Sequence, residues 1–97
     1  MSITVLLELQ VKPDQVDTLK QMFEEALPDT RGFDGCIKLD ILVNQDQPAN
    51  MVLVQTWQTR AHQARYSSWR QETGFIAKMG ALLAAPPSVR YYDLLDL

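Results

Sequence analysis

The sequence predicts an α+β fold in which a four-stranded antiparallel sheet carries its helices on one face. Three observations predict it: strand-like segments stand at both ends of the chain, two alternating segments follow each other in the middle, and apolar residues recur at helical spacing in the stretches between. The chain has 97 residues, the length of one domain, so residues 1–97 are expected to form a single unit.

The first strand is expected over residues 3–11. Its odd-numbered residues are all apolar, whereas most of the even-numbered ones are polar, which is the two-residue period of a strand. A helix follows at Pro13, because proline suits the first helical turn, and Pro28 and Gly32 are expected to mark the end of this helix. Its apolar stripe is formed by Val16, Leu19, Phe23, Ala26 and Leu27.

The second and third strands are expected to form a hairpin. Residues 35–44 alternate, and residues 51–57 form another apolar segment. The polar stretch between them, NQDQPAN, contains a proline and is longer than a two-residue turn. The apolar face of the second strand is expected to carry Ile37, Leu39, Ile41 and Val43.

A split helical region and a last strand complete the chain. Thr59 is expected to cap a helix that begins at the next residue, and Thr73 to cap another helix after a break near Gly74. The two prolines at 86–87 should end this region, because proline lacks the N–H that a helix needs. Residues 88–97 return to strand character. The resulting order, β-α-β-β-α-β, is that of the ferredoxin-like fold.

This order leaves one face of the sheet without helices. In the first strand that face carries either the odd-numbered apolar residues or the even-numbered set, in which Leu6 interrupts the polar residues. Neither set suits full contact with water. A second copy of the chain packed sheet to sheet is therefore expected, and the protein should be a homodimer.

The composition excludes several classes of partner. Nine basic and twelve acidic residues give a net charge of -3, and the basic ones are dispersed, so no nucleic acid is expected as partner. No apolar run is long enough to cross a membrane and the N-terminus has no signal-peptide pattern, so a cytoplasmic location is expected. The lone Cys36 is expected to be an inert thiol. Without metal-ligand spacings or a glycine-rich phosphate loop, no metal or cofactor is expected.

Two segments resemble the antibiotic biosynthesis monooxygenase family. They are VLVQTWQTRAHQARY, in which a strand ends at Trp57 and Thr59 precedes a helix, and LLAAPPSVRYYDLL near the C-terminus. The resemblance extends over nearly the whole chain. It implies a dimeric α+β barrel, in which each subunit has a mostly apolar cavity between sheet and helices.

The resemblance also implies the kind of chemistry. Members of the family include oxygenases of polycyclic phenols or quinols that use no flavin, haem or metal, as well as haem-degrading enzymes and isomerases. Many members carry a histidine where this chain has Tyr66, and often an acidic residue where it has Gln55, so haem degradation is not expected. The implied function is a cofactor-independent monooxygenase that oxidises a planar phenol or quinol with dioxygen. A non-catalytic binding or regulatory dimer and an isomerase remain open alternatives.

The segment after Trp57 supplies most candidate site residues. On a helix that begins at residue 60, one face carries His62, Arg65, Tyr66 and Trp69, and a second, small-residue face, expected against the sheet, carries Ala61, Ala64 and Ser68. His62, as a general base, and Tyr66 are the candidate catalytic residues. The candidate substrate-binding residues are Gln55, Trp57, Trp69 and Tyr91, of which the aromatic ones could equally belong to the core.

Overall fold

The computed structural model describes residues 2–97, and its elements follow the predicted order. The first half contains β1 (Ile3–Gln10), a 3-10 turn η1 (Pro13–Gln15), α1 (Val16–Arg31) and β2 (Cys36–Val43). The second half contains β3 (Asn50–Trp57), α2 (Arg60–Glu72), α3 (Phe75–Ala81) and β4 (Ser88–Tyr92). Within residues 2–97, no helix combines the length and the apolar character needed to cross a membrane.

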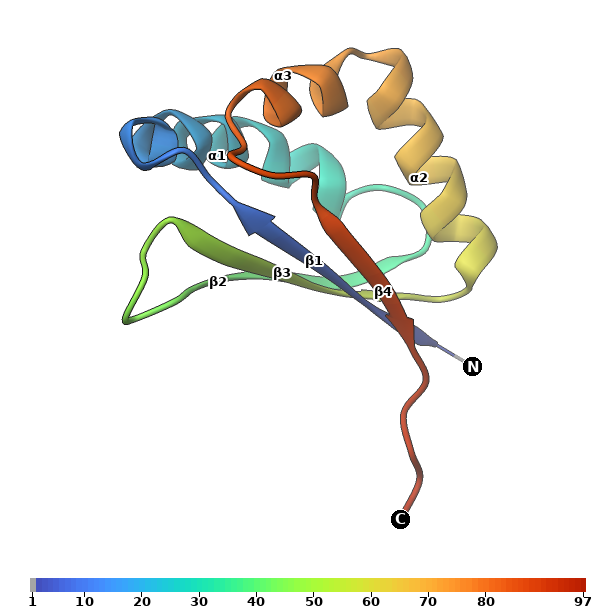
Figure 1. Cartoon of the computed structure of the whole chain (residues 1–97). Coiled ribbons are helices and arrows are strands. Elements are labelled where there is room, and N and C mark those ends of the chain that lie inside the picture. The colour runs from blue at the N-terminus through green and yellow to red at the C-terminus, as the bar shows by residue number, and fades with distance from the viewer. Residues whose placement is uncertain (1) are drawn as a thin grey trace.

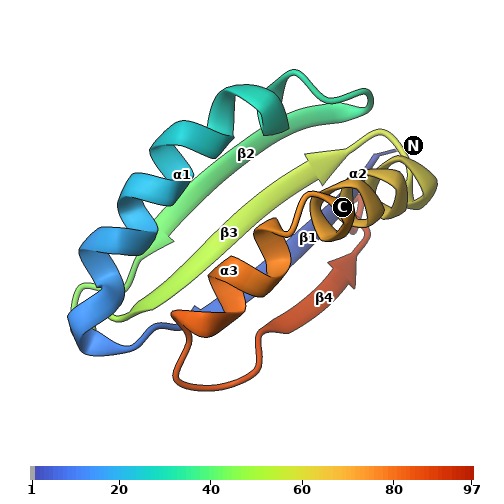
Figure 2. The same cartoon turned by 90° about the horizontal axis from the view of Figure 1, so that it is seen from above.

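The four strands form one antiparallel sheet in the order β2-β3-β1-β4. All the helices lie on one face of this sheet, and the other face is open (Figure 1). Seen from above, α1 runs along the β2 side, whereas α2 and α3 lie over the β1 side (Figure 2). This is the α+β ferredoxin-like arrangement that the sequence predicts.

Helix α1 does not stop at Pro28. It continues to Arg31 and ends at Gly32, whose N–H donates to the Pro28 carbonyl at 3.0 Å. Proline removes only one helical hydrogen bond, and the last turn is held from outside, because the buried side chain of Thr30 bonds to residues of α2. The expectation that Pro28 marks the helix end was therefore wrong, while that for Gly32 is confirmed.

The predicted caps of α2 and α3 have different outcomes. Thr59 caps α2, since its hydroxyl accepts from the His62 N–H at 3.2 Å. Thr73 does not cap α3: its hydroxyl donates to the Arg70 carbonyl at 2.9 Å and so closes α2. The N-cap of α3 is Gly74, with a φ of 80° that glycine adopts without strain. The bend between the two helices therefore depends on the positive φ of glycine and not on a capping hydroxyl.

Strand β2 is less regular than its alternation predicts, and α3 and the last strand are shorter than expected. A register shift between Cys36 and Lys38 displaces Ile37, which is 55% exposed, so that in β2 only Leu39 and Ile41 pack on the inner side. Helix α3 ends at Ala81, well before the two prolines, and the last strand ends at Tyr92.

Paired residues of β1 and β3 divide the inner face of the sheet into three zones. At one end Leu9 pairs with Met51, and both belong to a closed apolar core that also includes Leu19 and Phe23 of α1. At the other end Ile3 pairs with Trp57, next to an aromatic cluster of Phe33, Trp57, Tyr66 and Trp69. The middle zone, where neither cluster fills the space, is described below.

The outer face of the sheet is mixed in character. A half-buried apolar pair, Leu6 and Val54, lies at its centre, and Leu42 beside it is 54% exposed. Charged residues flank this strip, with Lys38 3.3 Å from Asp40 and Arg90 3.6 Å from Glu8. The C-terminal tail, which carries the exposed leucines at 94, 95 and 97, runs away from the body of the subunit (Figure 1).

Candidate functional site

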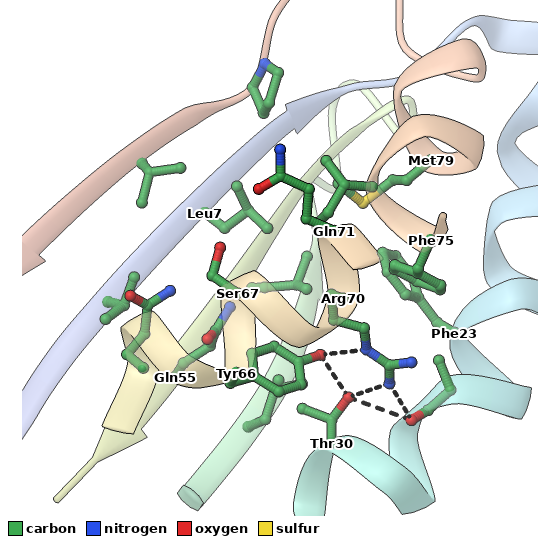
Figure 3. Close-up of a pocket in the computed structure, with 18 of the residues that line it drawn as sticks. Leu7, Phe23, Thr30, Gln55, Tyr66, Ser67, Arg70, Gln71, Phe75 and Met79 are labelled. Atoms are coloured by element: carbon green, nitrogen blue, oxygen red, sulfur yellow. Dashed lines mark hydrogen bonds between the residues drawn. The ribbon is translucent and has the colours of Figure 1, made fainter. Parts of the chain in front are cut away.

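A cavity of about 340 Å³ occupies the middle zone between the sheet and the helices (Figure 3). Its floor is formed by two cross-strand pairs, Val5 with Gln55 and Leu7 with Leu53. Helices α1, α2 and α3 and the edge strand β4 supply the walls, which include Phe23, Tyr66, Phe75, Met79 and Tyr91. The volume lies within the range of about 300 to 1,000 Å³ that is usual for small-molecule sites, and the lining is mostly apolar.

The main polar feature of the cavity is a cluster of Thr30, Tyr66 and Arg70 that joins α1 to α2 (Figure 3). Arg70 Nε donates to Tyr66 Oη at 2.9 Å, and its Nη2 donates to Thr30 Oγ1 at 2.8 Å and to the Ala26 carbonyl at 2.9 Å. The hydroxyls of Thr30 and Tyr66 share a hydrogen bond of 2.7 Å. Arg70 therefore fixes both hydroxyls in place.

Arg70 is a buried cation whose protein partners are neutral. Its residue is only 6% exposed, and among residues 2–97 no carboxylate lies within 4.0 Å of its guanidinium. Aromatic rings surround it, with its Cζ atom 4.6 Å from the Trp69 centroid and 4.7 Å from that of Phe75. The negative end of α1 offsets part of the charge. A buried charge without an ionic partner is unusual and favours the binding of an anion.

A second polar group on the cavity floor, Gln55, is oriented by the next inner-facing residue of β3. The indole Nε1 of Trp57 donates to Gln55 Oε1 at 2.9 Å. Because an indole N–H can only donate, this bond fixes which way the amide of Gln55 points. Its nitrogen has no protein partner within residues 2–97 and is left to face the cavity.

A third polar group lies where β4 meets α2. Tyr91 Oη donates to Gln63 Oε1 at 3.3 Å, and the guanidinium of Arg60 stacks 3.8 Å above the Tyr91 ring. These contacts hold the tyrosine against the cavity although it stands on an edge strand.

Three of the six predicted site residues line the cavity: Gln55, Tyr66 and Tyr91. Trp57 lies on the inner face beside Gln55, just beyond the floor, and is 0% exposed. Trp69 stacks on Phe33 with ring centroids 5.4 Å apart. Both tryptophans thus support the wall rather than form its surface. The chemical roles predicted for all six residues remain predictions.

The sixth predicted residue, His62, lies outside the cavity lining at the beginning of α2. Its Nδ1 is 2.7 Å from Thr59 Oγ1, and its Nε2 is 3.7 Å from a carboxylate oxygen of Asp34. Its ring also packs against Gly35, where an added Cβ would overlap it. These contacts give His62 a place in the connection between α2 and the loop before β2.

Helix α2 is rotated relative to the prediction. The small residues expected against the sheet, Ala61, Ala64 and Ser68, are exposed. The face toward the cavity carries Gln63, Tyr66, Ser67 and Arg70, which also have the spacing i, i+3, i+4 and i+7. Sequence reasoning missed three of these residues, together with Thr30 of α1. The available signal was the four-residue spacing of Tyr66 and Arg70.

Other chemistry-bearing groups lie apart from the cavity. Burial raises the pKa of the Cys36 thiol, and nearby Arg31 opposes this only in part, so the thiol stays protonated at neutral pH. Among residues 2–97, no group of three or more His, Cys, Asp or Glu side chains could hold a metal ion.

Comparison with known proteins gives one family and many similar folds. The sequence model of the family described as antibiotic biosynthesis monooxygenase matches residues 2–77. Rv0793 from Mycobacterium tuberculosis has a TM-score of 0.88 and 23% identity, over 100% of this chain and 98% of that one. A conserved protein from Methanosarcina mazei Go1 has a TM-score of 0.88 and 16% identity, over 95% and 91% of the two chains. No protein of curated function matches significantly.

Proposed function

The chain belongs to the antibiotic biosynthesis monooxygenase family, and on that premise we propose that it oxidises a planar phenol or quinol with dioxygen, without a cofactor. The observation that carries the proposal is the cavity itself. It combines aliphatic and aromatic walls with hydrogen-bond donors from Gln55 and Arg70 at its polar side. An oxidisable aromatic ring would fit the walls, and the oxygen on that ring would meet the donors.

The proposed reaction needs little from the protein besides binding. Dioxygen is a triplet and reacts slowly with closed-shell molecules, but a phenolate or enolate can donate one electron to it and then combine with the reduced oxygen. When a ring CH₂ becomes C=O, or when a quinol becomes a hydroxyquinone, one atom of O₂ enters the product and the other leaves as water. Both hydrogens of that water and all four electrons come from the substrate. The donors in the cavity would stabilise the anion from which the electron departs.

In this proposal the polar residues have distinct tasks. Arg70 and the amide of Gln55 hold the ring oxygen, and Tyr66, fixed by Arg70 and Thr30, donates or accepts at the same place. Trp57 and Trp69 do not touch the substrate in this proposal. Trp57 acts by orienting Gln55, and Trp69 acts by packing in the aromatic cluster with Tyr66.

Oxygen uptake tests the proposal. Purified protein treated with a chelator is given anthrone or 1,4-naphthohydroquinone at a pH near the pKa of the substrate, so that part of it is ionised. Dioxygen consumption is followed with an electrode beside product formation. We expect uptake in proportion to protein and one O₂ per product. Tyr66→Phe should lower the rate, whereas Ala61→Ser, on the exposed face of α2, should not. Uptake no faster than in buffer, for substrates shown to bind, would refute the proposal.

One observation favours a second candidate, a binding or regulatory protein with the same cavity. Within residues 2–97, none of the residues that line the cavity is Asp, Glu or His, the usual general bases. Tight binding of planar aromatics without oxygen uptake or any change in the ligand would support this candidate.

The role of His62 can be decided by one variant. A general base contributes about 10²- to 10⁴-fold to a rate, so His62→Ala would abolish most turnover if His62 were the base. Because the ring lies outside the cavity, we expect turnover to change by less than about twofold, far below that 10²-fold threshold. The same variant should unfold more easily by about 1 kcal/mol, since it loses the contact with Thr59. Steady-state kinetics and urea denaturation measure the two effects.

We also propose that the open face of the sheet pairs with a second copy of the chain. Leu6 and Val54 form a cross-strand pair at the centre of that face. In Val54→Lys a charge would be buried in the interface, so we expect a dimer for the natural chain and a monomer for the variant. Light scattering after size exclusion measures both masses, and Ala61→Lys, on an exposed helix face, is the matched control. A Val54→Lys protein that stays dimeric would exclude this interface.

A further inference from the structure

Two of the amide acceptors that line the cavity already have partners, whereas the side-chain oxygens of Ser67 and Gln71 have none among residues 2–97. The oxygen of Gln55 accepts from Trp57, and the oxygen of Gln63 accepts from Tyr91. Both amides are therefore oriented with their N–H₂ groups free to donate. Arg70 has no acceptor at all, and its Nη1 has no hydrogen-bond partner among residues 2–97. Around Arg70 and Gln55 the polar side of the cavity thus offers donors and one positive charge, and its free acceptors are the uncharged Ser67 and Gln71.

The same cavity offers no group that would take a proton from a bound molecule. Within residues 2–97 its lining contains no Asp, Glu or His. The hydroxyls of Thr30 and Tyr66 both accept from the Arg70 guanidinium, and a neutral hydroxyl is a poor proton acceptor. A neutral phenol would enter this site without a base to ionise it.

We propose that the cavity is a receptor for an oxyanion on a planar ring, and that the substrate is already ionised when it enters. The chemical class is an aromatic molecule with an acidic phenol or enol, or with a ring carboxylate. Arg70 is the residue that recognises the charge, and Gln55, oriented by Trp57, supplies the second donor. This inference rests on the proposed function in its choice of ring, and it concerns binding rather than oxygen chemistry.

The competing explanation is that Arg70 only ties α2 to α1. Its bonds to Thr30 and to the Ala26 carbonyl do join the two helices. A neutral Gln or Asn side chain would serve such a tie without the cost of a buried charge. A tie also predicts no dependence of ligand binding on ligand charge, which makes the two explanations separable by experiment.

Matched pairs of probes test the proposal by isothermal titration calorimetry. The first pair is 2-hydroxy-1,4-naphthoquinone, an enolate at neutral pH, and its neutral analogue 2-methoxy-1,4-naphthoquinone. The second pair is 2-naphthoate and 2-naphthamide. We expect at least one anion to bind about 10- to 100-fold more tightly than its neutral partner, the usual effect of a charge-assisted hydrogen bond. The pair with the larger ratio identifies the acidic group, enolate or carboxylate.

Variants assign the effect to the named residues. Arg70→Gln should reduce the anion preference to less than about threefold while the neutral probe binds as before, and Arg70→Lys should keep part of it. If Arg70→Gln does not fold, the natural protein still gives an answer. Its affinity for the hydroxynaphthoquinone should fall as the pH is lowered through the pKa of that ligand, whereas its affinity for the methoxy compound should stay constant.

Equal affinities within both pairs would overturn the inference, and so would an anion preference that survives in Arg70→Gln. Failure of the proposed function gives a different result. Anion preference without oxygen uptake would leave the receptor in place and refute only the monooxygenase. Uptake with neutral phenols and no anion preference would refute only the receptor.

Discussion

Trp57→Ala is expected to lower the free energy of unfolding by about 3 to 5 kcal/mol, the usual cost of removing a large aromatic side chain from a core. Trp57 is 0% exposed, and its ring centroid lies 5.0 Å from that of Tyr66 and 6.3 Å from that of Phe33. The truncation would also leave the buried oxygen of Gln55 without its donor. For a small domain this loss is a large part of the total stability.

Two further variants separate packing from hydrogen bonding. Trp57→Phe keeps an aromatic ring but removes the indole N–H, so it should cost about 1 to 3 kcal/mol and also weaken anion binding through the released amide of Gln55. Trp69→Ala is the matched control, because Trp69 belongs to the same cluster but is only half-buried. Urea denaturation followed by circular dichroism measures all three. A cost for Trp57→Ala no larger than that for Trp69→Ala would contradict the assignment.

Gly35→Ala should destabilise the protein by at least about 3 kcal/mol, for two reasons that add. Gly35 has a φ of 89°, which costs any other residue about 1 to 2 kcal/mol. A Cβ at this position would also overlap the His62 ring near its attachment to the backbone, where the side chain cannot simply swing away. The backbone on both sides is fixed, since the Gly35 carbonyl accepts from the Gln58 N–H at 2.8 Å.

The chain contains its own control for this prediction. Gly74 has a similar φ of 80°, but a Cβ there would meet nothing within 4 Å, so Gly74→Ala should cost only about 1 to 2 kcal/mol. Adding His62→Ala to Gly35→Ala removes the overlap with the ring carbons but keeps the overlap with the Cβ of residue 62, so it should recover only about 1 kcal/mol. Chemical denaturation of the four variants measures the coupling. If Gly35→Ala and Gly74→Ala cost the same, the His62 contact is unimportant.

The sequence was most informative where a residue typical of a helix end stands next to a segment with helical spacing. Thr59 caps α2 as expected, because its hydroxyl can accept from one of the unpaired N–H groups at the start of the helix. The predictions for Pro28 and Thr73 were wrong because each ignored a hydrogen bond made by a nearby threonine hydroxyl. Thr30 is held by α2 beyond the proline, and the hydroxyl of Thr73 finds a carbonyl of its own helix.

Half of the site residues predicted from the sequence line the cavity in the structure. Gln55 could be placed because alternation along β3 puts it on the inner face with Leu53 and Trp57. Arg70 could not, because a buried arginine is exceptional and an arginine in a sequence is best assumed to be solvated. Helix α2 has no continuous apolar stripe, so nothing in its own residues fixes which side faces the sheet, and the predicted face was rotated away from the cavity.

The sequence by itself determined the element order, the ferredoxin-like topology and the family, because these follow from local periods and from a pattern that extends along the chain. Only the tertiary structure decided that His62 faces Gly35, that the indole of Trp57 orients the amide of Gln55, and that Arg70 is buried beside Thr30. The physical reason is that the rotation of a helix about its axis is set by packing against other elements, and a rotation of one residue exchanges the side chains that line a cavity for those that face water.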